Sequence, residues 1–212
     1  MTQQQRAQVT RDRALEGAAA VFARLGYAAA SLTDISAETG VSKGSLYFHF
    51  RSKEDLARAI VAREQELGKE SAERVIAAAA SSLEATMGLC ADFARHMATN
   101  QFARAGARLT TETTTFDPPL RGPFEDWIVL IGTLLTGAAA EGDLRTDVDP
   151  AVIAHFVIPA FTGVQMASAV LTDYADLVLR VREMWTVVLP GMVRPERLDA
   201  ALASLDRVLP LA

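Results

Sequence analysis

The sequence predicts an all-α fold of about ten helices, with an N-terminal three-helix domain over residues 1–53 and a larger C-terminal helical domain over residues 54–212. Three observations lead to this fold class. Apolar residues recur at spacings of three and four along most of the chain. Capping residues, glycines and prolines divide these periodic segments into lengths typical of helices. The alternating pattern of a half-buried strand is missing from the sequence.

The composition is that of a folded protein from a reducing compartment. Of the 212 residues, 50% are hydrophobic and 22% are charged, which is enough for one sizeable core or two modest helical ones. A single cysteine, Cys90, excludes an intramolecular disulfide framework and a cysteine-rich zinc site. The first residues lack the apolar core of a signal peptide, and charged or polar residues interrupt the later apolar stretches. We therefore expect a soluble, cytoplasmic protein.

The charge is unevenly distributed along the chain. The net charge is −5, yet the first 58 residues hold eight Arg or Lys against six Asp or Glu, so this segment is near +2 and the remainder near −7. Such an asymmetry is typical of a nucleic-acid-binding module joined to an acidic domain with a different task.

Three helices are expected before residue 50. The first covers about Thr10–Leu25 and ends at Gly26. Thr33 is a suitable N-cap for a short second helix, which Gly40 stops in a left-handed conformation. Ser42 then caps a short third helix. One face of the first helix carries apolar residues at helical spacing: Leu15, Ala18, Phe22 and Leu25.

The remaining helices follow after a capping pair. Ser52 and Asp55 have the spacing of a capping box and start a long fourth helix. Further helical segments are expected from about residue 81, at about 102–109, 123–140, 149–168 and 174–189, and from 195 onward. Pro190 and Gly191 are expected to end the segment that precedes them.

The second and third helices, joined by a short glycine-containing turn, form a helix-turn-helix, whose second helix enters the major groove of DNA. Lys43 at the start of that helix can donate to guanine O6 and N7, and Gly44 lets the backbone approach the base edges. Lys53 and the free amides of the fourth helix form a phosphate site. Other residues complete the predicted DNA-binding set: Thr33, Ser42, Ser45, Tyr47 and His49. Phe48 and Phe50 are expected to be core residues.

The string LTDISAETGVSKGSLYFHFRSKEDL resembles the DNA-binding signature of the tetracycline-repressor (TetR) family, and the preceding TR and AAAVFARLGY segments keep the family order. The resemblance covers roughly the first quarter of the chain and implies a transcriptional regulator. Later segments extend it over most of the chain, because RAGARLT, GPFEDW, AFTGVQ, and MW followed by LPG resemble the ligand domain of the γ-butyrolactone autoregulator receptors. That subfamily implies a homodimeric repressor of secondary metabolism that a diffusible butyrolactone, butenolide or furan releases.

Two residues depart from the subfamily pattern. Ser42 and Ser45 stand where the subfamily usually has Thr and Ala. The change at Ser42 removes a methyl group that could contact thymine. The operator sequence of the subfamily is therefore not carried over to this chain.

A ligand of this class is mostly apolar with a few oxygen acceptors, so its site should be an apolar cavity with few hydrogen-bond donors. Trp127 offers a broad ring face and an indole donor, Thr162 a hydroxyl, and Gln65 an amide. By resemblance, Trp127 lines the pocket, and Thr162 and Gln65 stand where related receptors contact signal oxygens. Phe93 is expected to be plain core. Because Gln65 lies on the predicted fourth helix, a bound ligand would act on the segment that leads to the DNA-binding domain.

A homodimer is expected, because one short recognition helix reads only a few base pairs and such repressors use paired half-sites. The predicted helices at about 149–168 and 174–189 are the expected interface, as they are in the family. The expected partners are thus operator DNA, a small apolar signal molecule and a second copy of the chain. No metal or other cofactor is expected.

Other functions stay open at this point. The sequence carries none of the metal-ligand, nucleophile-elbow or phosphate-loop motifs that an enzyme would need. A helical interaction module would bind no DNA. Among regulators, the alternatives are a pseudo-receptor that responds to antibiotics or pathway intermediates, and a drug-efflux regulator, whose pocket usually adds acidic or several aromatic groups. The acidic pI of about 5.3 favours a true signal receptor.

Overall fold

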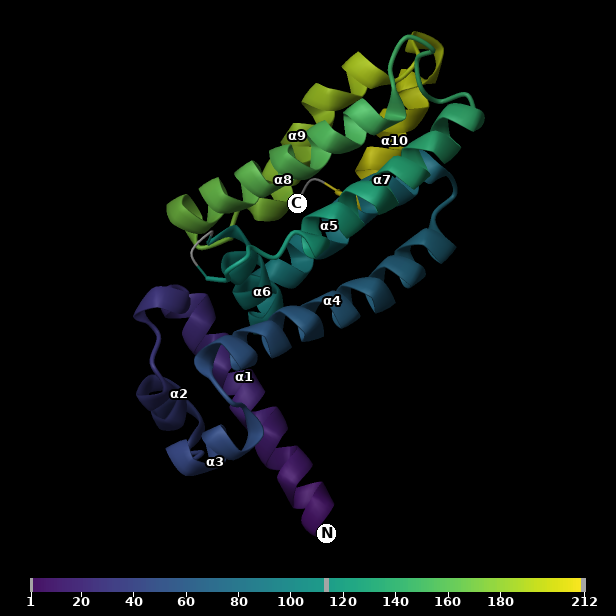
Figure 1. The fold of residues 1–212 in the computed structure, drawn as a ribbon. Helices are drawn as coiled ribbons and strands as arrows, with labels where there is room; N and C mark the ends of the chain where they lie inside the picture. The colour runs from purple at the N-terminus through teal and green to yellow at the C-terminus, as the bar shows by residue number, and fades with distance from the viewer. Residues whose placement is uncertain (1, 113–114, 211–212) are drawn as a thin grey trace. The chain divides into compact units, whose positions relative to one another are not determined.

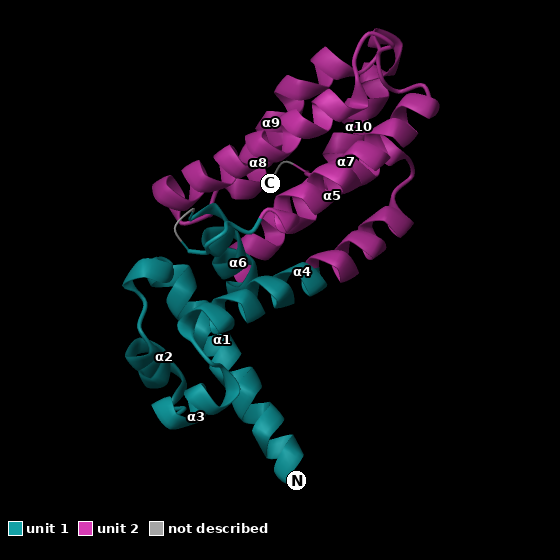
Figure 2. Cartoon of the chain, viewed as in Figure 1, with its two compact units in different colours: residues 1–67, 100–120 teal, residues 68–99, 121–212 magenta. Residues whose placement is uncertain are grey.

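The computed structural model describes residues 2–112 and 115–210, which form ten α-helices and one short 3-10 helix without any extended strand (Figure 1). The predicted all-α fold class is thus confirmed. The chain divides into two compact units: residues 1–67 with 100–120, and residues 68–99 with 121–212 (Figure 2). These are called unit 1 and unit 2. They do not follow the predicted boundary at residues 53 and 54, which stays a functional prediction, because α6 and the first part of α4 pack into the N-terminal unit.

Unit 1 contains α1 (Gln3–Ala29), α2 (Leu32–Thr39), α3 (Lys43–His49), the first part of α4 (Lys53–Ala78) and α6 (Gln101–Thr111). One cluster of buried side chains joins all five helices, among them Phe22, Ile35, Leu46, Leu56, Ile60 and Leu109. Removing such side chains from water is the main stabilising contribution in a small helical body. The helix-turn-helix is therefore anchored on α1, α4 and α6 together.

Two predicted helix starts in unit 1 are wrong. The first helix begins at Gln3, because Thr2 accepts a hydrogen bond from the Gln5 amide and forms a capping box with it. Ser31, not Thr33, is the N-cap of α2. The Ser31 hydroxyl accepts from the Asp34 amide at 3.2 Å, and the Asp34 carboxylate accepts from the Ser31 amide at 2.9 Å. This reciprocal pair satisfies two backbone donors, so it outcompetes a cap at Thr33.

Gly26 breaks the first helix where the sequence predicts, with φ of 77° and ψ of 174°. The break exposes backbone carbonyls near the end of α1, and Arg108 of α6 donates to two of them, Ala23 O and Arg24 O, at 3.0 Å each. Glu112 completes the junction by accepting from Arg108 Nε at 2.8 Å and from the Tyr27 amide at 2.9 Å. Charged donors and acceptors thus satisfy backbone groups that a helix end leaves unpaired.

Unit 2 contains the end of α4, α5 (Ser82–Thr99), α7 (Gly122–Ala140), α8 (Pro150–Thr172), α9 (Leu177–Met192), the 3-10 helix (Pro195–Arg197) and α10 (Leu198–Val208). Helices α5, α7, α8 and α9 lie side by side (Figure 1). Large buried side chains fill the space between them: Met87, Ile131, Leu135, Val157 and Trp185.

Pro190 lies inside α9, so the prediction that Pro190 and Gly191 end this helix is wrong. A proline removes one backbone donor, but the following amides still find carbonyls, as Val193 N donates to Leu189 O at 2.9 Å. Met192 and Val193 are buried, and this burial fixes the last turn.

α8 is long and apolar enough to cross a membrane by length and composition, and it is the one such helix in the described part of the chain. Only 33% of its apolar stretch is buried within the structure. Helices in protein cores and interfaces have the same length and composition. The exposed apolar face of α8 therefore also fits a helix that another chain covers.

Because of the α1–α6 junction, we expect the stability of the protein to be unusually sensitive to substitution of Gly26. In Gly26→Ala, the added Cβ would lie 2.4 Å from Glu112 Oε1 at a positive φ, so the variant must strain the backbone and displace the Arg108–Glu112 pair. We expect a loss of about 2 kcal/mol or more in stability, measured by circular dichroism in urea. Gly142→Ala is the matched control, because Gly142 also has a positive φ, of 82°, but no atom lies within 4 Å of the added Cβ. Equal losses in the two variants would show that the junction contributes nothing.

Candidate DNA-binding and ligand sites

The predicted recognition surface lies on α3, and helix caps lie on both sides of the turn that precedes it. Gly40 ends α2 in the left-handed conformation, with φ of 68°, as predicted. Ser42 is the N-cap of α3, and its hydroxyl accepts from the Ser45 amide at 3.2 Å. Arg13 of α1 donates to Thr39 O at 2.7 Å and fixes the end of α2. The turn is therefore rigid, and it presents α3 in one orientation.

The predicted base-reading residues lie on the outer surface of α3. Lys43 and Gly44 are exposed in its first turn, and Tyr47 is exposed one turn later. Within the described part of the chain, the Lys43 ammonium has neither a hydrogen bond nor an ion pair, so its three donors are available to an external acceptor. Ser45 and His49 are half-buried on the same short helix. Leu46 is the buried residue that attaches α3 to the core.

The prediction that Phe48 is a core residue is wrong. Its side chain is 81% exposed on α3, whereas Phe50 is 4% exposed. The Arg11 guanidinium carbon lies over the Phe50 ring, 5.2 Å from the ring centre. Helical geometry explains the difference, because Leu46 and Phe50 face inward at i and i+4, while Phe48 falls on the opposite side. An exposed aromatic ring next to Tyr47 adds an apolar group to the outer surface of α3. The spacing of four between Leu46 and Phe50 is the sequence signal that would have placed Phe48 on the exposed face.

The Lys53 side chain is hydrogen-bonded to backbone carbonyls of unit 1. Its ammonium donates to Tyr27 O at 2.8 Å and to Ala30 O at 3.0 Å, and it lies 4.2 Å from the centre of the Tyr27 ring. These contacts tie the start of α4 to the end of α1. Two of its three donors are thus used by the fold, and a phosphate contact through the third stays a prediction. Thr33 is exposed in the first turn of α2.

A cluster of three aromatic rings marks the candidate ligand site in unit 2. Phe93 of α5 packs edge-on against Trp127 of α7 at 6.3 Å and against Phe161 of α8 at 5.8 Å between ring centres. Phe93 and Trp127 are half-buried. The indole N–H of Trp127 makes no hydrogen bond within the described residues. Phe93, which the sequence pattern assigns to plain core, thus connects Trp127 to α8.

The other two predicted ligand residues are placed differently. Thr162 is half-buried on α8, next to Phe161, but its hydroxyl donates to Ile158 O at 2.9 Å, one turn earlier in the same helix. This back-bond uses the only hydroxyl hydrogen. Gln65 lies half-buried on α4 and belongs to unit 1, so its part in the ligand site stays a prediction.

Glu64, the neighbour of Gln65 on α4, is a buried acidic residue that the sequence pattern does not reveal. Burial raises the pKa of Glu64 to about 7. A Cβ added at Gly106 of α6 would lie 2.7 Å from its Cγ, so the missing side chain at residue 106 lets α4 and α6 approach closely. Near neutral pH, the charged and neutral forms of this carboxyl group coexist at the α4–α6 contact.

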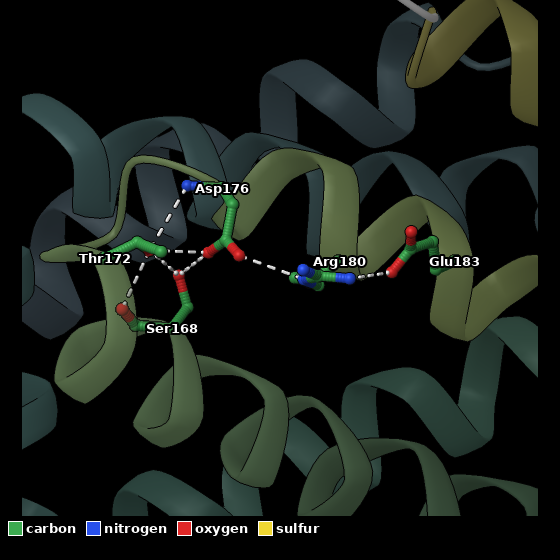
Figure 3. A network of polar contacts seen from close by, with 5 residues as sticks. All are labelled: Ser168, Thr172, Asp176, Arg180 and Glu183. Atoms are coloured by element: carbon green, nitrogen blue, oxygen red, sulfur yellow. Dashed lines mark hydrogen bonds and ion pairs between the residues drawn. The ribbon is translucent and has the colours of Figure 1, made fainter.

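An apolar groove of about 390 Å³ lies between α8 and α9. Seven apolar side chains line it: Phe156, Val164, Ala167, Leu171, Met184, Val187 and Val188. Polar groups close one end of the groove. Ser168 and Thr172 both donate to Asp176 Oδ1, at 2.6 Å each, and Arg180 donates to Asp176 Oδ2 at 2.9 Å (Figure 3). These hydrogen bonds lower the pKa of Asp176 to about 2. The polar end is therefore internally neutralised, and the apolar face is left without a partner in the single chain.

Comparison with known proteins covers most of the chain. A model described as "Bacterial regulatory proteins, tetR family" matches residues 14–60, and one described as "Tetracyclin repressor-like, C-terminal domain" matches residues 80–194. The chain is 34% identical to the A-factor receptor protein of Streptomyces griseus over 92% of its own length and 68% of that protein.

Two solved structures are similar in fold and sequence. The structure of CprB from Streptomyces coelicolor with its biological operator sequence superposes with a TM-score of 0.86 at 33% identity, covering 98% of this chain and 100% of that chain. A γ-butyrolactone receptor described as an ArpA-like protein superposes with a TM-score of 0.80 at 33% identity, covering 95% of this chain and 97% of that chain.

Replacing Phe48 should affect mainly DNA affinity, whereas replacing Phe50 should affect mainly stability. Phe48→Ala should leave the melting temperature nearly unchanged, because the ring is exposed, yet weaken binding to a recognised DNA site by about 1 kcal/mol through loss of apolar contact. Phe50→Ala should cost about 3 to 5 kcal/mol of stability, because it opens a cavity under α3. Thermal melts and gel shifts on the same preparations separate the two effects. Wild-type DNA affinity in Phe48→Ala would remove Phe48 from the DNA-binding surface.

Proposed function

Since the chain belongs to the TetR family of bacterial transcriptional regulators, we propose that it is a cytoplasmic repressor that binds operator DNA as a homodimer and is released by a small γ-butyrolactone-type signal. A butenolide or furan of similar size and polarity falls in the same ligand class. The genes it controls would belong to secondary metabolism, in keeping with its similarity to the A-factor receptor protein of Streptomyces griseus.

The observation that carries the DNA-binding part is the exposed face of α3. A rigid turn with a left-handed glycine presents a short helix whose first turn carries an unpaired Lys43 ammonium and Gly44. A lysine at the N-terminal end of a recognition helix can reach guanine O6 and N7. The exposed Tyr47 and Phe48 extend this surface by one turn.

The outer face of α8 and α9 supports the homodimer. Large apolar side chains there are exposed in the single chain, among them Val152, Phe156, Met166, Val170, Leu171 and Val187. Exposed apolar patches of this kind mark interaction surfaces. Two copies related by a two-fold axis would present two recognition helices to half-sites about 34 to 36 Å apart.

Release by a ligand requires that the ligand prefer one of two conformers. Units 1 and 2 are connected within α4, at the α5–α6 junction and at residues 120 and 121. A ligand held by unit 2 could therefore shift α4 and α6, and through them the separation of the two recognition helices. A shift from 1:99 to 99:1 needs about 5.5 kcal/mol of differential binding. The same α4 orientation in operator-bound and ligand-bound protein would contradict this mechanism.

A gel shift with the upstream region of its own gene tests the repressor and the ligand class together. We expect a specific complex that a member of a panel of synthetic γ-butyrolactones, butenolides and hydroxymethylfurans dissociates at nanomolar to micromolar concentration. Lys43→Ala is the control for sequence readout, with a loss of about 1 to 3 kcal/mol on specific DNA and little change on random DNA.

Two other results would change the proposal. A firm complex that no panel member releases would favour a pseudo-receptor or efflux regulator that responds to an antibiotic or biosynthetic intermediate. Absence of any complex with DNA would remove the repressor itself.

If α8 and α9 form the dimer interface, one charge added on α9 should separate the dimer. In Val187→Glu, a side chain that is 80% exposed and lines the groove becomes an acid, present twice in a two-fold interface, so burial should cost several kcal/mol. Light scattering should report a monomer, and operator affinity should fall. Val129→Glu, on α7 and 67% exposed, is the matched control and should stay dimeric. A dimeric Val187→Glu would place the interface elsewhere.

A further inference from the structure

His155 is the one ionisable residue of α8, whose other residues are apolar or neutral. The His155 side chain is exposed in the single chain, and its ring makes neither a hydrogen bond nor an ion pair with another described residue. Its neighbours on the helix surface, Val152 and Phe156, are large exposed apolar side chains. An ionisable ring therefore stands within an apolar surface.

The exposed face of α8 has the residue spacing of a helix-packing seam. Its members are all exposed and recur at intervals of three and four residues: Val152, His155, Pro159, Gly163, Met166 and Val170. This is the a and d pattern by which one helix packs along another. A Cβ added at Gly163 would meet no atom within 4 Å, so the centre of the seam is uncovered in the single chain. A second helix packed along this seam would cover His155.

The elements packed against α8 supply little negative charge for a protonated His155. On α7, the two acids, Glu125 and Asp126, lie near the start of the helix, and residues 127–140 carry no charge. On α9, the single acid is Glu183, which accepts from Arg180 at 2.8 Å (Figure 3). Residues 184–193 are again without charge.

The connection from α7 to α8, residues 141–149, holds four acids, and each already accepts a hydrogen bond. The pairs are Glu141 with the Ser82 hydroxyl, Asp143 with Arg197, Asp147 with Arg145, and Asp149 with the Ala151 amide. A charged ring at residue 155 would thus lack a free carboxylate among these neighbours.

We propose that protonation of His155 separates the two copies of the chain, so that the dimer is stable near neutral pH and weakens in acid. This inference rests on the proposed homodimer through α8 and α9 and adds a control of its assembly. Inside an apolar interface, a charged ring would lose its hydration without gaining a partner, whereas a neutral ring is tolerated. Histidine is the side chain that ordinarily changes charge between pH 5 and 8.

Acid should weaken the dimer because association expels one proton from each protonated ring. With two rings of ordinary histidine basicity per dimer, the dissociation constant should rise about tenfold or more from pH 7.5 to pH 6.0. The net charge acts in the opposite direction. It is −5 at pH 7 and the pI is about 5.3, so acidification lowers the repulsion between two copies. Weaker association in acid would therefore not come from net charge.

The experiment measures the dimer dissociation constant of the full chain at pH 7.5 and pH 6.0 by fluorescence-detected sedimentation over a dilution series. DNA is left out, so that His49 of α3 contributes nothing to the readout. His155→Gln, which stays neutral, should change by less than about threefold between the two pH values. His155→Lys, charged at both, should be mostly monomeric at pH 7.5. His96→Gln is the matched control and should keep the wild-type response, because His96 lies on α5, 3.0 Å from Asp92.

The outcomes distinguish the switch from the proposed dimer. Equal stability of the wild-type dimer at both pH values would overturn the switch, and so would an unchanged pH response in His155→Gln. Tighter association in acid would also overturn it, because the ring would then pair with a carboxylate of the second copy. A His155→Lys dimer as stable as wild type at pH 7.5 would place residue 155 outside the interface. A wild-type monomer at pH 7.5 would instead overturn the proposed homodimer, and the switch with it. Circular dichroism of each variant checks that the exposed substitution leaves the helices intact.

Discussion

The guanidinium of Arg108 on α6 satisfies the backbone carbonyls of Ala23 and Arg24 near the end of α1, and much of unit 1 depends on this contact. It exists because Gly26 breaks the helix with a backbone that only glycine adopts easily, and because the absence of a side chain there leaves room for Arg108 and Glu112. Arg108 is half-buried, and Glu112 supplies a counter-charge at 2.8 Å that orients its guanidinium toward these carbonyls. The junction thus joins α6, distant in sequence, to the helix on which the recognition surface is built.

This junction bears on the release from DNA that we propose. Unit 1 includes α6 as well as the helix-turn-helix, so a displacement of α6 displaces α1 and, through the shared core, α3. α4 enters the same core through Leu56 and Ile60 and continues without a break into unit 2. The Glu64 side chain lies against Gly106, so α4 and α6 approach each other closely at this point. Under the proposed function, a ligand that shifts one of these helices would act on the other through this point of contact.

Local patterns were sufficient for the parts of the fold that local chemistry determines. The left-handed end of α2 at Gly40, the cap at Ser42 and the break at Gly26 could all be predicted, because each depends on one residue and its immediate neighbours. The start of α2 was misplaced because Ser31 and Thr33 are both good caps, and only the reciprocal bond from Asp34 separates them. Partners from distant helices, such as Arg108 for α1, leave no local pattern, and neither does the compact unit that they create.

The predicted ligand residues show the same limit more sharply. Thr162 follows Phe161 and Gln165 lies between Val164 and Met166, so both are polar residues in an apolar stretch of α8. They differ only in whether the helix itself uses their donors, and that depends on rotamers and burial. A threonine can return its hydroxyl to its own helix at almost no cost, as Thr162 does to Ile158 O, whereas the longer side chain of a glutamine points away from its own backbone. Whether a polar side chain of α8 stays open to an external partner thus depends on its rotamer and on the helices packed around it, and neither is encoded in the neighbouring sequence.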